Sequence, residues 1–201
     1  MSLEILPEAV TPGALVEQGK TSIAFVVDRI LEVALADGGL GGIVLTEIPV
    51  ADPYVKDYDA VKGEGPTRWA KRFDVSNWAI IGARRDGVRV GGAVVAFRTA
   101  DLHMLGGRDD IAVLWDIRVA PGQRGAGVGS ALFRAVEGWA GDRGCGWLKI
   151  ETQNVNTAAC RFYRKMGCVL GAIDRFAYPE LPGETQLLWW KALRAPSESQ
   201  P

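Results

Sequence analysis

The first half of the chain contains four apolar runs of strand length, separated by polar residues and glycines. They cover residues 23–31, 43–50, 78–84 and 88–99. Residues 85–87, Arg-Asp-Gly, join the last two runs, and an Asp-Gly step between apolar runs is typical of a β-hairpin. The pattern therefore predicts an antiparallel meander in this half.

A different segment lies between these strands. Residues 52–74 mix proline, glycine and charge, and residues 67–73 have the composition of a short helix. A connection of this length in a folded domain is usually functional. We therefore expect a long loop with local structure that lies outside the main sheet.

The second half alternates strand and helix patterns. Strands are expected at 111–119, 147–152 and 168–173, and helices at 130–142 and 156–166. Such alternation predicts parallel pairing through right-handed crossovers. The first helix carries an apolar stripe that should pack on the sheet; the stripe comprises Leu132, Val136 and Trp139, with Phe133 beside it. Residues 185–193 read as a final strand, and the polar residues 194–201 should fray.

Length and composition fit one soluble domain. The chain has 201 residues, of which 48% are hydrophobic and 23% charged, so a substantial core is expected. Lys and Arg (23) nearly balance Asp and Glu (24), which gives no overall field for nucleic acid or an anionic membrane. No run reaches the roughly 18 uncharged residues of a membrane helix. Residues 1–10 lack the pattern of a signal peptide, so we expect a cytoplasmic protein.

The cysteines and the histidine do not suggest a metal site. Cys145, Cys160 and Cys168 have no Cys-x-x-Cys spacing, and the single histidine, His103, is distant from them in sequence. We expect no protein metal site. The thiols should be small buried hydrophobes or free surface thiols in a reducing compartment.

A glycine-rich segment follows the strand at 111–119. Residues 120–130 read APGQRGAGVGS and lead directly into a helical pattern. Glycines allow successive N–H groups to point at phosphate oxygens, and a helix N-terminus adds about half a positive charge. Arg124 could add a charge-assisted contact. A plain strand-to-helix turn has the same pattern, so this segment alone leaves both interpretations open.

Two other phosphate-binding motifs fit less well. A nucleoside triphosphate loop needs Gly-Lys before Ser or Thr, and no lysine precedes Ser130. A dinucleotide fingerprint would lack its last glycine, although Glu151 stands near the position of a ribose-binding acid. The antiparallel first half counts against a dinucleotide fold, which usually opens a longer parallel series.

Two motifs in order resemble those of the GNAT superfamily of acetyl-CoA-dependent N-acetyltransferases. The loop Arg124-x-x-Gly127-x-Gly129 resembles the pyrophosphate motif of that superfamily. Residues 156–168, NTAACRFYRKMGC, resemble the helix that flanks pantetheine and thiol. The resemblance covers roughly residues 80–193. Within the superfamily, residues 116–121 (DIRVAP), 151–156 (ETQNVN), 159–163 (ACRFY) and 53–58 (PYVKDY) are most similar to the streptothricin acetyltransferases.

This resemblance implies a fold and a cofactor. The fold would be α+β, with a mixed, mostly antiparallel sheet, a central parallel pair and flanking helices. Residues 1–201 would form a single N-acetyltransferase domain, with a variable substrate-side region at 1–75, an acetyl-CoA-binding core at 76–193 and a polar tail at 194–201. The residues implied in acetyl-CoA binding are Ile117, Val119, Gln123, Arg124, Gly125, Ala126, Gly127, Val128, Gly129, Ser130, Asn156 and Tyr163.

The catalytic candidates follow from the chemistry of amine acetylation. An alkyl ammonium with a pKa near roughly 10 must lose a proton before it attacks a thioester, so a carboxylate is expected nearby. Glu151 and Asp116 are the candidate bases, on strands that should be neighbours, and the resemblance favours Glu151. Asn156 and Tyr163 are seven residues apart and should share one helix face, and Tyr163 would protonate the departing thiolate.

Several roles have simpler alternatives. Glu151 could be a solvated acid at a strand end, and Tyr163 a core aromatic residue, while Phe162 is expected to be the packing residue of this pair. Arg118 is expected to be solvated or salt-bridged rather than catalytic. The backbone of 117–119 would pair with pantetheine amides, and the N–H of Val119 could stabilise an oxyanion.

The acceptor is expected to be a primary amine of a small cationic molecule, with a streptothricin-type antibiotic as the favoured example. Loop composition alone suggests acids and aromatic faces for a cation; these are Asp101, Asp109, Asp110, Asp174, Tyr54, Tyr58, Tyr178 and Trp189. Acetylation of a protein or peptide amine and a non-catalytic acyl-CoA-binding sensor are the alternatives. The sequence allows a homodimer and does not require one.

Overall fold

The protein is described by a computed structural model that covers residues 2–61 and 63–193. It divides into two compact units. The described parts of Met1–Ile23, Tyr58–Ile150 and Trp190–Pro201 form unit 1, and Ala24–Asp57 with Glu151–Trp189 form unit 2. The division into regions 1–75 and 76–193 of one domain stays a prediction, and the expected fraying of 194–201 lies outside the described residues.

Unit 1 is built on five strands in the order β1-β4-β5-β6-β7. These are β1 (Leu3–Glu8), β4 (Ala79–Arg85), β5 (Val88–Ala96), β6 (Ile111–Val119) and the part of β7 (Trp147–Gln153) up to Ile150. The first three pairings are antiparallel, whereas β6 and β7 are parallel from Ile111↔Trp147 to Leu114↔Ile150. The predicted mixed sheet with one parallel pair is confirmed.

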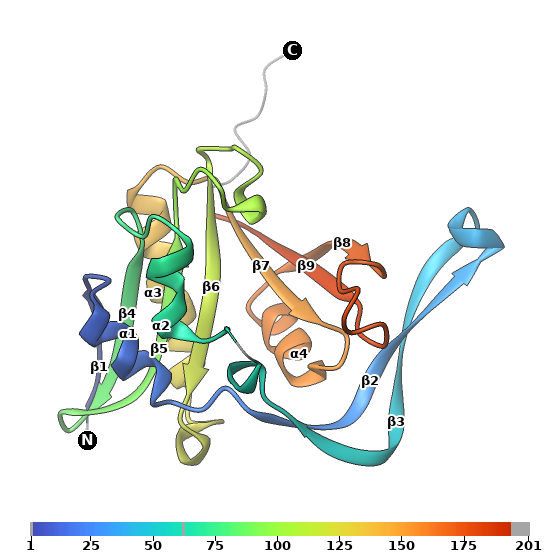
Figure 1. Cartoon of the computed structure of the whole chain (residues 1–201), viewed down its shortest axis with the longest axis horizontal. Coiled ribbons are helices and arrows are strands. Elements are labelled where there is room, and N and C mark those ends of the chain that lie inside the picture. Colours follow the sequence, from blue (N-terminus) through green and yellow to red (C-terminus); the bar gives the residue numbers. More distant parts are fainter. Residues whose placement is uncertain (1, 62, 194–201) are drawn as a thin grey trace. The chain divides into compact units, whose positions relative to one another are not determined.

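Helices pack on this sheet. The helices α1 (Pro12–Gly19) and α2 (Pro66–Arg72) contact each other, and α3 (Val128–Asp142) contacts β4, β5 and β6 (Figure 1). Leu15 of α1 and Trp69 of α2 join a buried cluster with Ile80, Val94 and Val113 of the sheet. The α3 stripe predicted from the sequence is buried, as expected for a helix packed on a sheet; it comprises Leu132, Phe133, Val136 and Trp139.

A β-bulge in β6 changes which side chains share a face. Val94 pairs with Asp116 and Val95 with Leu114, so Trp115 is the extra residue on β6. The Trp115 ring lies 6.3 Å from the ring of Trp69 in α2, and the carboxylate of Asp116 accepts a hydrogen bond from Gln18 in α1. In a regular strand neighbouring side chains point to opposite faces. The bulge therefore lets two consecutive residues reach the helices α1 and α2.

Unit 2 contains two groups of strands. A separate two-stranded antiparallel sheet consists of β2 (Phe25–Ala36) and β3 (Gly42–Lys56). The other elements are the end of β7, the helix α4 (Thr157–Lys165), β8 (Val169–Asp174) and the part of β9 (Gln186–Ala192) up to Trp189, with β9 between β7 and β8. Asn154 connects the two groups: its amide donates to the carbonyl of Leu31 and accepts from the N–H of Thr185.

Three sequence predictions need correction. Residues 52–56 continue β3 and are not loop, because pairing with β2 extends to Phe25↔Lys56. The strand at 168–173 exists as β8, but β9 lies between it and β7, so β7 and β8 are not a neighbouring parallel pair. The elements β1 and α1 had not been predicted. By contrast, the short helix expected at 67–73 is confirmed as α2, outside the seven-stranded sheet.

The three cysteines provide a test of the packing. Cys145, Cys160 and Cys168 are buried thiols that form no disulfide, and burial raises the pKa of the Cys160 thiol to about 12. Since the thiolate is the reactive form, we expect a chromogenic disulfide reagent at about pH 8 to leave all three thiols unmodified in the native protein. The same reagent should titrate three thiols after denaturation. Rapid reaction of any thiol in the native protein would contradict this packing.

Candidate functional site

The glycine segment after β6 ends in an open helix N-terminus. A 3₁₀ turn at Pro121–Gln123 is followed by Gly125 and Gly127 with φ of 80° and 83°, and α3 begins at Val128. Among residues 2–61 and 63–193, no side chain caps this helix, and its first turn has no acidic residue. The first N–H groups of a helix lack partners within the helix. This terminus therefore presents unsatisfied donors and a partial positive charge.

The conformation explains why glycine is needed in this segment. A Cβ atom at Gly125 or Gly127 would meet no atom within 4 Å, so crowding does not exclude a side chain. Both residues are in the left-handed region, which side-chain-bearing residues rarely adopt. The side of the loop on which the Cβ atoms of residues 125 and 127 would lie is therefore free of other protein atoms.

Arg124 ties the loop to its surroundings within unit 1. Its Nε donates to the carbonyl of Val119 at 3.1 Å, and its Nη2 donates to the carbonyl of Ser22 at 3.3 Å. The neighbouring Gln123 accepts a hydrogen bond from Arg85 at 2.6 Å. A direct contact of Arg124 with a phosphate stays a prediction, because its guanidinium here holds backbone carbonyls.

A buried ion network surrounds the end of β6. Arg118 donates through Nε to both oxygens of Asp116, at 3.0 and 2.8 Å, and through Nη1 and Nη2 to Asp59. Gln18 of α1 donates to Asp116 at 2.6 Å. The side chains of Arg118 and Asp116 are 1% and 3% exposed. The predicted salt-bridged role of Arg118 is confirmed.

Burial and charge act against each other in this network. Burial raises the pKa of Asp116, while Arg118 and Gln18 act to lower it. Burial also opposes the charge of Arg118, but Asp116 and Asp59 outweigh burial and raise the pKa of that guanidinium. Arg118 is therefore held as a cation between two acids. The hydrogen bonds of Asp116 to Arg118 and Gln18 are those of a structural carboxylate, and its role as a base stays a prediction.

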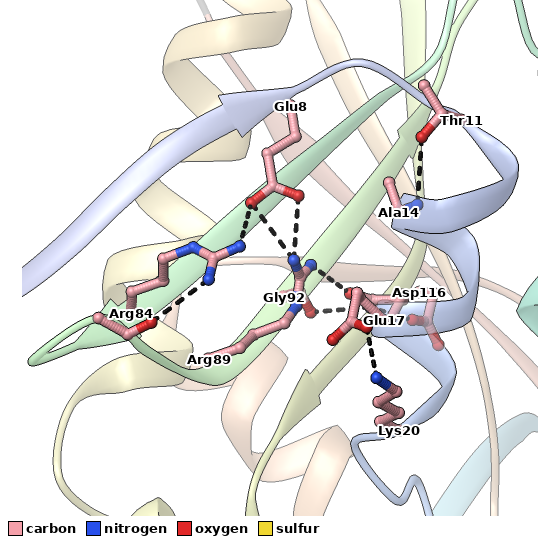
Figure 2. A network of polar contacts seen from close by, with 11 residues as sticks. Glu8, Thr11, Ala14, Glu17, Lys20, Arg84, Arg89, Gly92 and Asp116 are labelled. Atoms are coloured by element: carbon pink, nitrogen blue, oxygen red, sulfur yellow. Dashed lines mark hydrogen bonds and ion pairs between the residues drawn. The ribbon is translucent and has the colours of Figure 1, made fainter.

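The network continues to the edge strand. Arg89 donates to Gln18 at 2.9 Å and to Glu8 of β1 at 3.0 Å, and Arg84 also reaches Glu8 (Figure 2). Gly92 makes this route possible, since a Cβ at that position would lie 2.2 Å from Oε1 of Gln18. Polar contacts thus run from β1 through α1 to β6, and Figure 2 shows Glu8 facing both arginines.

Unit 2 holds the second group of predicted residues. Glu151 lies on β7, and its Oε1 accepts a hydrogen bond from the hydroxyl of Tyr178 at 2.7 Å. Gln153, two residues further on the strand, donates to the same hydroxyl oxygen at 3.0 Å. Glu151 is therefore a hydrogen-bonded carboxylate rather than a merely solvated strand-end acid.

Asn156 and Tyr163 do not both lie within the helix α4. Asn156 is the N-cap, outside the helix proper, and its Oδ1 accepts the N–H of Ala159 at 3.1 Å. Tyr163 is 6% exposed, and its ring lies 6.4 Å from that of Trp189. Phe162 is only half-buried, so the expectation that it is the packing residue of the pair was wrong. The reason is the helical spacing: Tyr163 shares the buried face of α4 with Thr157 and Cys160, and Phe162 does not.

A cavity of about 570 Å³ lies within unit 2. Its lining combines aromatic rings, prolines and charged groups; it includes Ile30, Glu32, Asn154, Arg175, Phe176 and Tyr178. Phe176 is 84% exposed, which is unusual for a phenylalanine. Tyr178 lines this cavity and also donates to Glu151, so it connects the cavity to that carboxylate.

Comparison with known proteins places the chain in a family. Residues 45–168, more than half of the chain, match the acetyltransferase (GNAT) family. The chain belongs to this family. Its members transfer acyl groups, so we treat the protein below as a GNAT acetyltransferase.

Relatives of this GNAT chain cover most of its length. Streptothricin acetyltransferase of Streptomyces lavendulae is 29% identical over 155 residues, which are 77% of this chain and 78% of the relative. The crystal structure of nourseothricin acetyltransferase matches with a TM-score of 0.73 at 27% identity, over 94% of this chain and 99% of that one. A second crystal structure is that of a streptothricin acetyltransferase from Bacillus anthracis str. Ames, so named there, in complex with acetyl coenzyme A. It matches with a TM-score of 0.73 at 26% identity, over 96% of this chain and 99% of that one.

Each unit of the GNAT chain holds part of the predicted site. Unit 1 contains Asp116, the β6 backbone at 117–119 and the loop 123–130, and unit 2 contains Glu151, Asn156 and Tyr163. Sequence analysis missed Gln18, Asp59 and Gln153. The alternation of Glu151 and Gln153 on a strand could have indicated a shared partner, whereas nothing in the sequence marked Gln18.

Across residues 2–61 and 63–193, no group of three or more His, Cys, Asp or Glu side chains is arranged to hold a metal ion. No helix in that same range has both the length and the apolar character needed to cross a membrane.

The buried cation of this GNAT chain gives a stability prediction. Replacement of Arg118 by methionine leaves Asp116 and Asp59 without their cation, and we expect a loss of about 3–5 kcal/mol in the free energy of unfolding. The control is Arg108→Met, which breaks the exposed pair of Arg108 with Asp110 and should cost about 1 kcal/mol or less. Denaturant unfolding compares the two. Equal losses would show that the buried network contributes no more than a surface pair.

Proposed function

We propose that the protein transfers acetyl from acetyl-CoA to a primary amine of a small cationic molecule, with a streptothricin-type antibiotic as the favoured acceptor. Two relatives that share most of the chain are named for such an activity: one is a streptothricin acetyltransferase and the other a nourseothricin acetyltransferase. The observation that carries the proposal is the uncapped N-terminus of α3 behind two left-handed glycines. A cytoplasmic location and a homodimer remain predictions from the sequence.

The loop of unit 1 suits the pyrophosphate of acetyl-CoA. The N–H groups of Gln123, Arg124 and Ala126 bond to carbonyls within the loop. The N–H donors left for a ligand are those of Gly125, Gly127 and the first turn of α3, and the helix end offers a favourable dipole. In this proposal Gly125, Gly127 and the first turn of α3 hold the diphosphate, and β6 at 117–119 provides backbone for the pantetheine amides. Bound acetyl-CoA supplies the acetyl thioester for the transfer.

The residues of unit 2 suit the proton transfers. Glu151 takes one proton from the ammonium and so frees the amine nitrogen, which attacks the thioester carbon. As the C–S bond breaks, the Tyr163 hydroxyl gives its proton to sulfur and is restored by the second proton that nitrogen loses. The indole N–H of Trp189, near Tyr163, is buried and has no partner among the described residues. This unpaired donor favours a ligand that binds there. Such a donor costs about 1–3 kcal/mol until an acceptor arrives.

The direct test combines binding and turnover. Calorimetry should show binding of acetyl-CoA, and mass spectrometry should then show streptothricin heavier by one acetyl group. A parallel panel of lysine, a polyamine and a peptide amine tests the acceptor class. Binding without turnover on any amine would refute the transferase proposal, and turnover on the peptide alone would refute the small-molecule acceptor.

A glycine pair tests the pyrophosphate loop. Gly127→Ala forces a side chain into the left-handed region, at a cost of about 1–2 kcal/mol, and should weaken acetyl-CoA binding by about ten-fold. Gly122→Ala is the matched control: the same loop has open space there, and Gly122 has no positive φ. Calorimetry should find its affinity unchanged. Equal affinities for both variants would place the diphosphate elsewhere.

The proton donor is tested at Tyr163. Tyr163→Phe keeps the ring that packs near Trp189 and removes only the hydroxyl. We expect kcat to fall by about 10²- to 10⁴-fold, because general acid catalysis typically contributes this much, while acetyl-CoA affinity is retained. Steady-state kinetics and calorimetry measure the two quantities. A variant with normal kcat would exclude Tyr163 as the donor.

A further inference from the structure

The hydroxyl of Tyr178 is at the centre of a small hydrogen-bond network in unit 2. Tyr178 lies in the loop between β8 and β9 and donates to Oε1 of Glu151 at 2.7 Å. Nε2 of Gln153 donates to its oxygen at 3.0 Å. A phenol has one O–H donor and two lone pairs. Glu151 therefore takes the O–H, and Gln153 occupies one of the two lone pairs.

This arrangement fixes the direction of the Tyr178 proton. Gln153 is the donor to the Tyr178 oxygen, so the O–H is left for Glu151. Burial, with the nearby charge of Glu151, raises the pKa of Tyr178 above its usual range, so the hydroxyl keeps its proton. Glu151 is consequently the acceptor of this hydrogen bond.

Glu151 retains one oxygen for another partner. Glu151 and Gln153 are two residues apart on β7, and their side chains therefore lie on the same face of the strand. Tyr178 bridges these two side chains through Oε1 of Glu151. In the part of the chain that the structure describes, Oε2 of Glu151 has no hydrogen-bond partner. The network thus limits rotation of the carboxylate while one oxygen remains able to accept a proton.

We infer that Tyr178 is a positioning residue for Glu151, which it holds as an oriented proton acceptor for the amine. This inference rests on the proposed function, in which Glu151 deprotonates the acceptor ammonium. Tyr178 keeps its own proton throughout, and Gln153, which donates to the Tyr178 oxygen, leaves that proton for Glu151. Tyr178 also lines the cavity of unit 2, so a ligand in that cavity would lie beside the residue that positions the base.

A double-mutant cycle tests the inference. Tyr178→Phe removes only the hydroxyl, and we expect kcat to fall about ten-fold, the effect of one hydrogen bond to a charged group, with acetyl-CoA affinity unchanged. Glu151→Gln should lower kcat by about 10²- to 10⁴-fold. If Tyr178 acts through Glu151, the double variant should be no slower than Glu151→Gln alone.

The pH profile adds a readout that a packing defect would not change. Near pH 10 an alkyl amine loses its proton without help, so Glu151→Gln and Tyr178→Phe should both regain rate relative to wild type as the pH approaches about 10. The control, Thr99→Val, deletes a buried hydroxyl that accepts from Trp78 at 2.7 Å in unit 1. It should lose stability while kcat and its pH dependence stay those of wild type.

The outcomes separate the inference from the function. A normal kcat for Tyr178→Phe beside a slow Glu151→Gln overturns the positioning role and leaves the proposed function intact. Multiplicative losses in the double variant also overturn it, because Tyr178 would then act independently of Glu151. Absence of acetyl transfer by the wild-type protein overturns both proposals.

Discussion

The arrangement of unit 1 depends on one buried cation. Arg118 stands at the end of β6 between Asp116 on its own strand and Asp59 just after β3, and it also donates to the carbonyl of Thr21. Removing a guanidinium from water costs several kcal/mol unless nearly every donor finds an acceptor. Here two carboxylates and a carbonyl provide the acceptors. Segments that are distant in sequence must therefore stand at defined positions around β6, which leads into the glycine loop.

Backbone irregularities make this arrangement possible. The bulge at Trp115 turns Asp116 toward α1, and the missing side chain of Gly92 gives Gln18 room to reach that carboxylate. A regular strand with an alanine at 92 would leave the acid on the wrong face and block the amide. Small local departures from ideal strand geometry thus decide where the charges of unit 1 lie.

Sequence patterns recovered the elements whose residues repeat with a clear period. The strand Ile111–Val119, the α3 stripe and the parallel pairing of β6 and β7 were all predictable, because apolar spacing and the glycine loop mark them. The elements β1 and α1 were missed, since Pro7 interrupts the strand and α1 has only eight residues. Contacts such as Gln18 with Asp116 or Tyr178 with Glu151 join residues distant in sequence, and no local pattern reports them. The loop residues 123–130 were proposed from their motif and their role stays a prediction, whereas the polar partners of the candidate acids needed coordinates.

The tether made by Arg124 has a thermodynamic consequence. A flexible loop that must be ordered by its ligand loses affinity to the entropy of that ordering. Here a guanidinium fastened to the carbonyls of Val119 and Ser22 restrains the segment beforehand. In the proposed function, the diphosphate of acetyl-CoA would meet donors at α3 that are already arranged, so more of its interaction energy would be retained as affinity.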